Sequence, residues 1–199
     1  MRRASIAVCL FASLACGDVP SELAGDRPPV GHAADAAPPI DDSDVPHKVV
    51  FATSGKHDGD FGGLAGADQI CAEHAQYAGL AGEFKAWLSS PDESAEARLA
   101  HADISYARTD GARVAAGWDD LVDGELVAPI DRDEGGVPVS GDAWTGTLPS
   151  GGIADFTCAG FASRDEAGVC GSSSETGASW TESSRPPCTS ALRLYCVEQ

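Results

Sequence analysis

The sequence has little positive charge and few aromatic side chains. Only 13 of its 199 residues are Lys or Arg, against 31 Asp or Glu, so the formal net charge is −18, and aromatic residues make up 7%. Binding to nucleic acid, sulfated polymers or anionic lipid surfaces requires clustered Lys and Arg that displace counterions. We therefore exclude nucleic acid and heparin as partners, although the body of the chain has basic residues at Lys85, Arg98, Arg108 and Arg113.

Signatures of common catalytic sites are also missing. The sequence contains no Gly-x-Ser-x-Gly nucleophile motif and no His-Glu-x-x-His zinc motif. Gly55-Lys56 is followed by His57, where a phosphate-binding loop requires Ser or Thr. Asp119-Asp120 and Asp123 offer carboxylates for glycoside chemistry, but nothing places one of them in an apolar pocket. We expect a protein that is not an enzyme, and the alternative is a secreted hydrolase that uses acidic loop residues.

The N-terminus has the pattern of an export signal. Two arginines precede an apolar run, Ile6 to Ala15, that is too short to span a bilayer. We predict a signal peptide over residues 1–15, with cleavage before Cys16. Cys16 resembles the acylated cysteine of a bacterial lipoprotein, although Ser13 stands where such sites usually carry Leu. We expect an outer-membrane or cell-surface lipoprotein that contacts the membrane only through this lipid. If Cys16 is not acylated, we expect a secreted protein.

A linker and one domain follow the predicted signal. Residues 16–46 are rich in Pro, Ala and Asp and show no helical or strand periodicity, so we expect a disordered tether there. Residues 47–199 should form the folded domain. We expect strands over 48–53, 83–88 and 192–197, and a helix over 67–78 that ends at Gly79. Ser90-Pro91-Asp92-Glu93 resembles a capping box and predicts a second helix from Ser90 to about His101.

The chain is rich in cysteine, which suggests an oxidising compartment. Signal cleavage would remove Cys9, and lipidation would commit Cys16. Five of the seven cysteines then remain for the domain, at positions 71, 158, 170, 188 and 196. The spacing alone does not choose how they pair.

Several motifs of the domain together resemble the endostatin domain of collagen XVIII. Residues 71–90 resemble its opening, in which a cysteine-bearing helix precedes a strand. The matching features that follow in the same order are Trp118, Ala-Trp-Thr-Gly at 143–146, Cys158, Cys188 and Leu-Tyr-Cys-Val-Glu at 194–198. A bacterial family of exported proteins of unknown function is more similar still, with Gly-Gly-Leu-Ala-Gly-Ala-Asp at 62–68 and Trp-Asp-Asp-Leu at 118–121.

The resemblance implies an α+β domain with a C-type-lectin-like fold. In such a domain two helices pack on a twisted antiparallel sheet, with long loops and disulfide staples. Carried over to this chain, it implies the disulfides Cys71–Cys196 and Cys158–Cys188. Cys170 has no counterpart, so a buried thiol, an intermolecular bridge and a competing disulfide partner all remain open for it.

The resemblance also implies a binding role rather than catalysis. Sugar-binding C-type lectins hold calcium with Glu-Pro-Asn or Gln-Pro-Asp and with Trp-Asn-Asp, and this chain has neither proline tripeptide. Trp180 is followed by Thr181-Glu182, so calcium-dependent sugar binding is not expected. We expect an adhesion module for an extracellular protein or glycan, or else a purely structural envelope protein. The candidate contact residues are Trp118, Asp119, Asp120, Trp144 and Trp180, all in or near the long loops.

The sequence contains only incomplete metal-binding motifs. Asp131, Asp133 and Asp142 have part of the spacing of an EF-hand loop, but Asp142 stands where that loop needs Glu, so we favour a solvated acidic turn over a calcium site. His47 and Asp110 lie near the zinc positions of endostatin, and two ligands are too few for such a site. His74 falls on the apolar stripe of the predicted helix and is expected to be a core residue.

Overall fold

The computed structural model describes residues 45–199. The predicted signal peptide, the lipidation candidate Cys16 and most of the predicted linker lie outside the described residues. Within residues 45–199, no helix combines the length and apolar character needed to cross a membrane.

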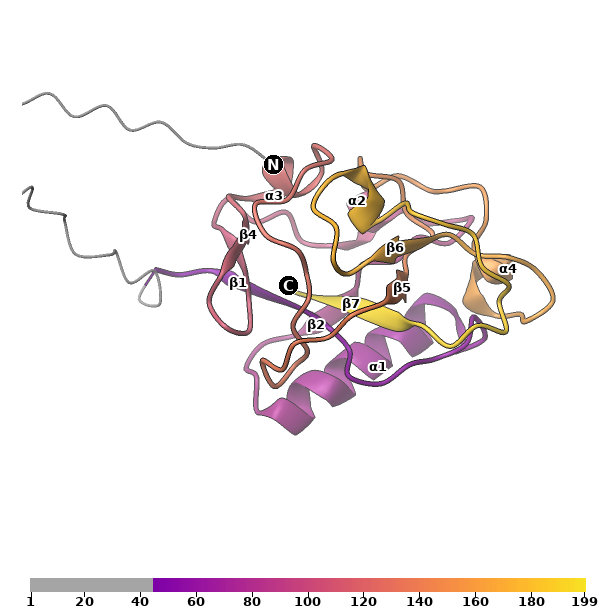
Figure 1. Ribbon diagram of the computed structural model, residues 1–199, viewed down its shortest axis with the longest axis horizontal. Helices are drawn as coiled ribbons and strands as arrows, with labels where there is room; N and C mark the ends of the chain where they lie inside the picture. Colours follow the sequence, from indigo (N-terminus) through magenta and orange to yellow (C-terminus); the bar gives the residue numbers. More distant parts are fainter. Residues whose placement is uncertain (1–44) are drawn as a thin grey trace, which may run out of the picture. The chain divides into compact units, whose positions relative to one another are not determined.

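A curled sheet of seven strands forms the centre of this part of the chain (Figure 1). The strand order is β4-β3-β1-β7-β5-β6, and β2 pairs with β7 as well. The strands are β1 (Lys48–Ala52), β2 (Phe84–Ala86), β3 (Tyr106–Arg108), β4 (Arg113–Ala115), β5 (Asp142–Trp144), β6 (Cys170–Ser172) and β7 (Arg193–Glu198). The predicted first, second and last strands are therefore present, each shorter than or shifted slightly from its expected range.

The sheet is mixed, so the expectation of an antiparallel sheet was wrong for two of its pairs. β1 runs parallel to β3, and β5 runs parallel to β7. Parallel neighbours require a crossover connection. The segment between β1 and β3 provides one, because it contains the long helix and β2, and a similarly long connection joins β5 to β7. The α+β class of the domain stands.

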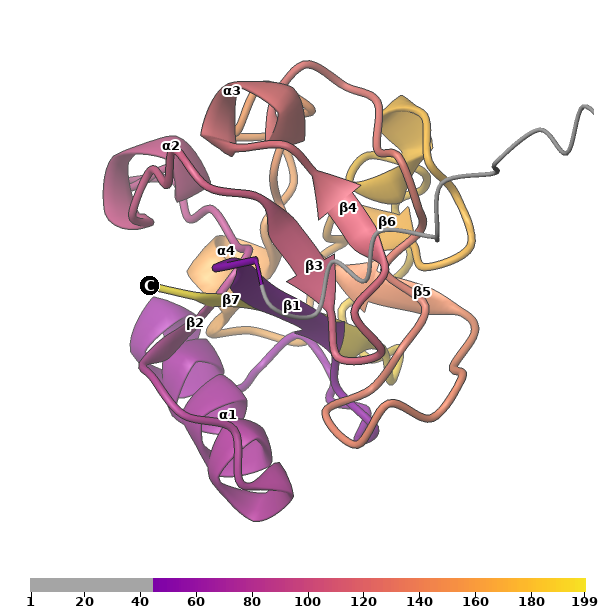
Figure 2. The ribbon, with the colours of Figure 1, turned by 90° about the vertical axis from the view of Figure 1, so that its left-hand side faces the viewer.

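One long helix, α1 (Gly63–Ala78), packs against the sheet beside β2 and β7, as Figure 2 shows. Its buried face consists of Ala67, Cys71 and Ala75, which recur at helical spacing. Gly79 ends the helix in the left-handed conformation, with a φ of 74° that favours glycine. The predicted helix end is therefore confirmed, and the start lies four residues earlier than expected.

The second predicted helix is much shorter than its capping pattern suggested. Ser90 Oγ accepts hydrogen bonds from the amides of Asp92 and Glu93, but these bonds close a turn rather than start a helix. The helix itself, α2 (Ala95–Arg98), begins after Ser94, whose side chain accepts a bond from the Ala97 amide. Two serines compete for the same role, and the later one is the N-cap. The other helices are also single turns: α3 (Trp118–Leu121), α4 (Cys158–Phe161) and the 3₁₀ turn η2 (Ala178–Trp180).

Two apolar clusters fill the interior. One gathers Trp87, Trp118 and Trp180 around Tyr195 of β7. The other surrounds the disulfides and contains Phe51, Phe84, Trp144, Phe161 and Leu194. Because neighbouring residues of β7 point to opposite faces of the sheet, this single strand contributes to both clusters.

Both disulfides implied by the resemblance are present. Cys71–Cys196 ties α1 to β7 across 125 residues, and Cys158–Cys188 closes a loop of the second half. Cys170 is a buried free thiol whose Sγ lies 3.0 Å from Ser184 Oγ. Burial raises the pKa of Cys170, which keeps the thiol protonated and unreactive. Two disulfides are typical of proteins that mature in an oxidising, extracellular environment.

Candidate functional site

Three of the five candidate contact residues lie together in an open groove. Trp118, Asp119 and Asp120 belong to α3, and the groove, of about 470 Å³, is also lined by residues 101–103. The two segments are joined by a hydrogen bond from the Trp118 amide to the Ala102 carbonyl, 2.9 Å long. This bond holds the two segments that line the groove together.

The face of Trp118 is covered within the groove. The His101 ring stacks on it with a centroid separation of 3.9 Å and an interplanar angle of 11°, which leaves Trp118 7% exposed. Nε2 of His101 is 2.8 Å from the Glu96 carbonyl, so the imidazole is held in place. Trp118 thus lines the groove, but His101 covers the face of its ring.

The carboxylates of the groove are not equivalent. Asp120 Oδ2 accepts a hydrogen bond from the Ala116 amide at 2.7 Å, and it caps the turn before α3. Asp103 and Asp119 are exposed and line the same groove. The groove thus offers two carboxylates free to accept hydrogen bonds from a ligand, beside the exposed ring of His101.

Trp144 and Trp180 are not contact residues. Trp144 is fully buried and Trp180 is 1% exposed, each inside one of the two apolar clusters. The indole N–H of Trp144 donates to the His57 carbonyl at 2.9 Å, which ties β5 to the loop after β1. The loops that contain these tryptophans fold inward, and the candidate binding role of both residues was wrong.

The partial calcium motif is used as a structural turn. Asp131 pairs with Arg108 and Arg132, and Asp133 Oδ1 accepts hydrogen bonds from the amides of Gly135 and Val137. Asp142 begins β5. Across residues 45–199, no group of three or more His, Cys, Asp or Glu side chains is placed to hold a metal ion.

The two residues near the zinc positions of endostatin also have other partners. His47 Nδ1 lies 2.9 Å from the Val45 carbonyl. Asp110 accepts from Arg108 at 2.9 and 3.0 Å and from Arg132 at 2.8 Å. Burial favours the neutral carboxyl, but the bond from Arg108, the Ala112 amide and the two guanidinium charges outweigh it, so the pKa of Asp110 is lowered.

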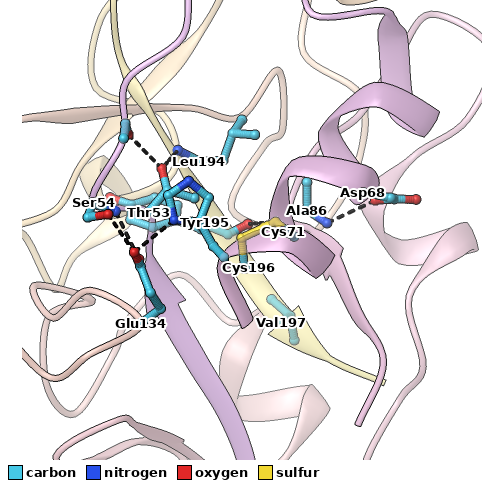
Figure 3. The surroundings of a disulfide bond; sticks show 12 residues. Thr53, Ser54, Asp68, Cys71, Ala86, Glu134, Leu194, Tyr195, Cys196 and Val197 are labelled. Atoms are coloured by element: carbon cyan, nitrogen blue, oxygen red, sulfur yellow. Dashed lines mark hydrogen bonds and ion pairs between the residues drawn. A yellow bond between two sulfur atoms is a disulfide. The ribbon is translucent and has the colours of Figure 1, made fainter. Parts of the chain in front are cut away.

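A second depression, of about 300 Å³, contains a group that sequence reasoning missed. Its centre is Glu134, which is 6% exposed and accepts a hydrogen bond from the Ser54 amide at 2.9 Å and another from the Ser54 hydroxyl (Figure 3). Nδ1 of His74 lies 2.8 Å from Glu134 Oε1, so His74 is not the core residue that its helical position suggested. Glu73 and the 90% exposed Tyr77 complete the rim.

The electrostatics of this depression follow from burial and hydrogen bonding. Burial favours the neutral form of Glu134, but the bonds from Ser54 and His74 outweigh it and lower the pKa of Glu134. His57 lies beside His74, with ring centroids 6.4 Å apart. Burial lowers the pKa of His57, the neighbouring His74 lowers it further, and Asp58 opposes this shift. His74 and Glu134 are 60 residues apart in the sequence, so no local motif could have predicted their contact.

No protein-family model matches the chain, and no curated protein is similar to it at a significant level.

Proposed function

We propose that this chain is an exported, non-catalytic binding module of the cell envelope, held at the membrane by a lipid on Cys16. The N-terminal pattern of residues 1–16 supports export and lipidation. The two disulfides support maturation outside the cytosol. The endostatin-like motifs, the curled sheet, the one long helix and the long loops support a C-type-lectin-like domain.

The groove beside α3 is the proposed binding site, and its ligand is an extracellular glycan. The observation that carries this proposal is the pair of exposed carboxylates, Asp103 and Asp119, beside the exposed His101 ring. Carboxylate oxygens accept hydrogen bonds from neighbouring sugar hydroxyls, and a fixed ring offers an apolar surface for the C–H groups of a sugar. The stack of His101 on Trp118 holds that ring in one orientation before the ligand arrives, which reduces the entropy lost on binding.

The same features argue against hydrolysis. A glycosidase needs one carboxyl group in apolar surroundings, so that it stays protonated and serves as the acid. Asp103 and Asp119 are exposed to water, and Asp120 is committed to the Ala116 amide. The groove is therefore suited to holding a ligand rather than to cleaving it.

A glycan and matrix-protein array tests this function. The full chain, with its disulfides intact, should bind one class of glycan, and EDTA should not abolish the signal, because the groove binds without calcium. Binding should also persist at high salt, since hydrogen bonds to hydroxyl groups are screened less than ion pairs. Binding only to basic matrix proteins, with loss at high salt, would contradict a glycan site.

A further inference from the structure

Two imidazole rings converge on one small space, away from the groove at α3. His57 lies in the loop after β1, and His74 lies on α1. A Cβ atom added to Gly55 would lie 3.2 Å from His74 Nε2 and 3.4 Å from His57 Nε2. Both ring nitrogens therefore lie close to the position that a side chain at residue 55 would occupy, and a Cβ there would crowd them.

The nitrogen of His57 has no partner there. Nε2 of His57 is buried and makes no hydrogen bond within the described residues. A buried polar atom without a partner costs free energy, commonly about 1–3 kcal/mol, and such atoms in native proteins usually indicate a missing ligand or water. The main chain of His57 is held by Leu192, because the His57 amide and carbonyl both pair with it, at 2.7 and 2.9 Å.

The nitrogen of His74 is oriented toward the same space by a buried carboxylate. Glu134 accepts from the Nδ1 side of the ring, and Ser54 fixes Glu134 through its amide and its hydroxyl. When Nδ1 carries the proton that Glu134 accepts, the lone pair of the neutral ring is on Nε2. Histidines that bind metals commonly have this carboxylate behind them, which sets the tautomer and makes the ligand nitrogen more basic.

We propose that His57 and His74 bind one Cu²⁺ ion through their Nε2 atoms. Imidazole nitrogen and water oxygen suit Cu²⁺, whereas Zn²⁺ needs at least three protein ligands, and Ca²⁺ and Mg²⁺ require several oxygen ligands. Water fills the remaining coordination positions, and His74 also lines the surface depression around Glu134. This two-histidine site is smaller than the three-residue clusters that the domain lacks, and it is independent of the glycan groove.

Titration calorimetry with ZnCl₂ and with CuCl₂ tests the site on the full chain with its disulfides formed. The expected result is one ion per chain, with Cu²⁺ bound more tightly than Zn²⁺. His57→Gln and His74→Gln should each weaken metal binding at least tenfold. The control His47→Gln removes an imidazole outside the site and should leave metal binding unchanged. Glu134→Gln should weaken binding by about 10–100-fold, since it removes the charge behind His74.

A pair of glycine variants tests the space itself and leaves both histidines in place. Gly55→Ala adds a methyl group at 3.2 Å from His74 Nε2 and should weaken metal binding at least tenfold. Gly177→Ala is the matched control, because a Cβ there meets nothing within 4 Å. Circular dichroism and thiol counting establish that each variant is folded and oxidised. If a histidine variant fails to fold, the comparison of Gly55→Ala with Gly177→Ala tests the metal site instead.

Three outcomes would overturn the proposal. The first is no saturable binding of Cu²⁺ by the folded wild-type chain. The second is binding of unchanged strength in His57→Gln and His74→Gln. The third is equal loss of binding in Gly55→Ala and Gly177→Ala. None of these outcomes bears on glycan binding at the α3 groove, which the array measures separately.

Discussion

Cys196 lies opposite Phe51 in the antiparallel pairing of β7 with β1, and its sulfur is bonded to Cys71 of α1. One residue of the last strand therefore connects the first strand and the long helix. The sheet, the helix and the chain's C-terminal strand are thus joined at a single point of the core.

Loss of this disulfide should destabilise the domain strongly. In Cys71→Ala/Cys196→Ala a loop of 125 residues is no longer closed in the unfolded chain, and chain-entropy estimates for such a loop give about 4–5 kcal/mol. Urea unfolding measures the loss of stability.

The control variant is Cys170→Ala, which removes only a buried free thiol and should cost about 1 kcal/mol. Peptide mapping without reduction should find Cys71 linked to Cys196, and a link from Cys71 to Cys158 would contradict this fold.

Asp68 should also contribute strongly to the stability of the domain. Asp68 accepts a hydrogen bond from the Ala86 amide at 3.0 Å (Figure 3). It also pairs with Arg98, whose side chain is 5% exposed and donates to the Ala86 carbonyl. Asp68→Ala leaves a buried guanidinium without its counterion, so we expect a loss of about 3 kcal/mol in the free energy of unfolding.

The matched control for that variant is Glu83→Ala. Glu83 lies 4.0 Å from Lys85 and its side chain is 72% exposed, so its removal should change stability by less than about 0.5 kcal/mol. Equal effects of the two variants in urea unfolding would mean that the contacts of Asp68 do not stabilise the domain.

Stability should depend on pH through Asp110. The folded state lowers the pKa of Asp110, so the ionised carboxylate stabilises the fold above the unfolded pKa of about 3.9. That contribution is lost as the pH falls through the lower folded pKa. The difference in unfolding free energy between wild type and Asp110→Asn should therefore be constant near neutrality and shrink below about pH 4. Parallel curves down to pH 2 would show that Asp110 has no such role.

The proposed lipid anchor predicts a chemical label. A bacterial host fed with radioactive palmitate should label the full chain, and Cys16→Ala should abolish the label. Cys170→Ala should keep it, because that thiol is buried in the domain. An unlabelled wild-type chain would contradict the lipid anchor.

The elements that the sequence predicted well are those with local signals. The helix α1 has apolar residues at helical spacing, β1 and β7 are short runs rich in β-branched and aromatic residues, and Gly79 marks a helix end by its own conformational freedom. The capping box at Ser90 was misleading because Ser94 offers an equivalent cap four residues later. The two parallel strand pairs had no local signal, since they depend on which segments return to the sheet after long connections.

The candidate sites were harder to predict for a similar reason. A tryptophan in a loop-rich region is either a contact residue or a core residue, and Trp144 and Trp180 proved to be core. The stack of His101 on Trp118 and the bond between His74 and Glu134 join residues that no short motif links. The disulfide pairing is the one long-range contact that could be predicted from the sequence. That prediction came from the resemblance to endostatin, because the cysteine spacing alone does not choose a pairing.

The glycan groove is tested most directly by placing variants on the same array. Asp119→Asn, which changes an exposed carboxylate of the groove, should weaken the glycan signal at least tenfold, or about 1.4 kcal/mol. Asp165→Asn is the matched control, because Asp165 is also exposed but is not one of the residues that line the groove. We expect loss of binding in Asp119→Asn and wild-type binding in Asp165→Asn. Undiminished binding by a folded Asp119→Asn and Asp103→Asn double variant would rule out a glycan site in this groove.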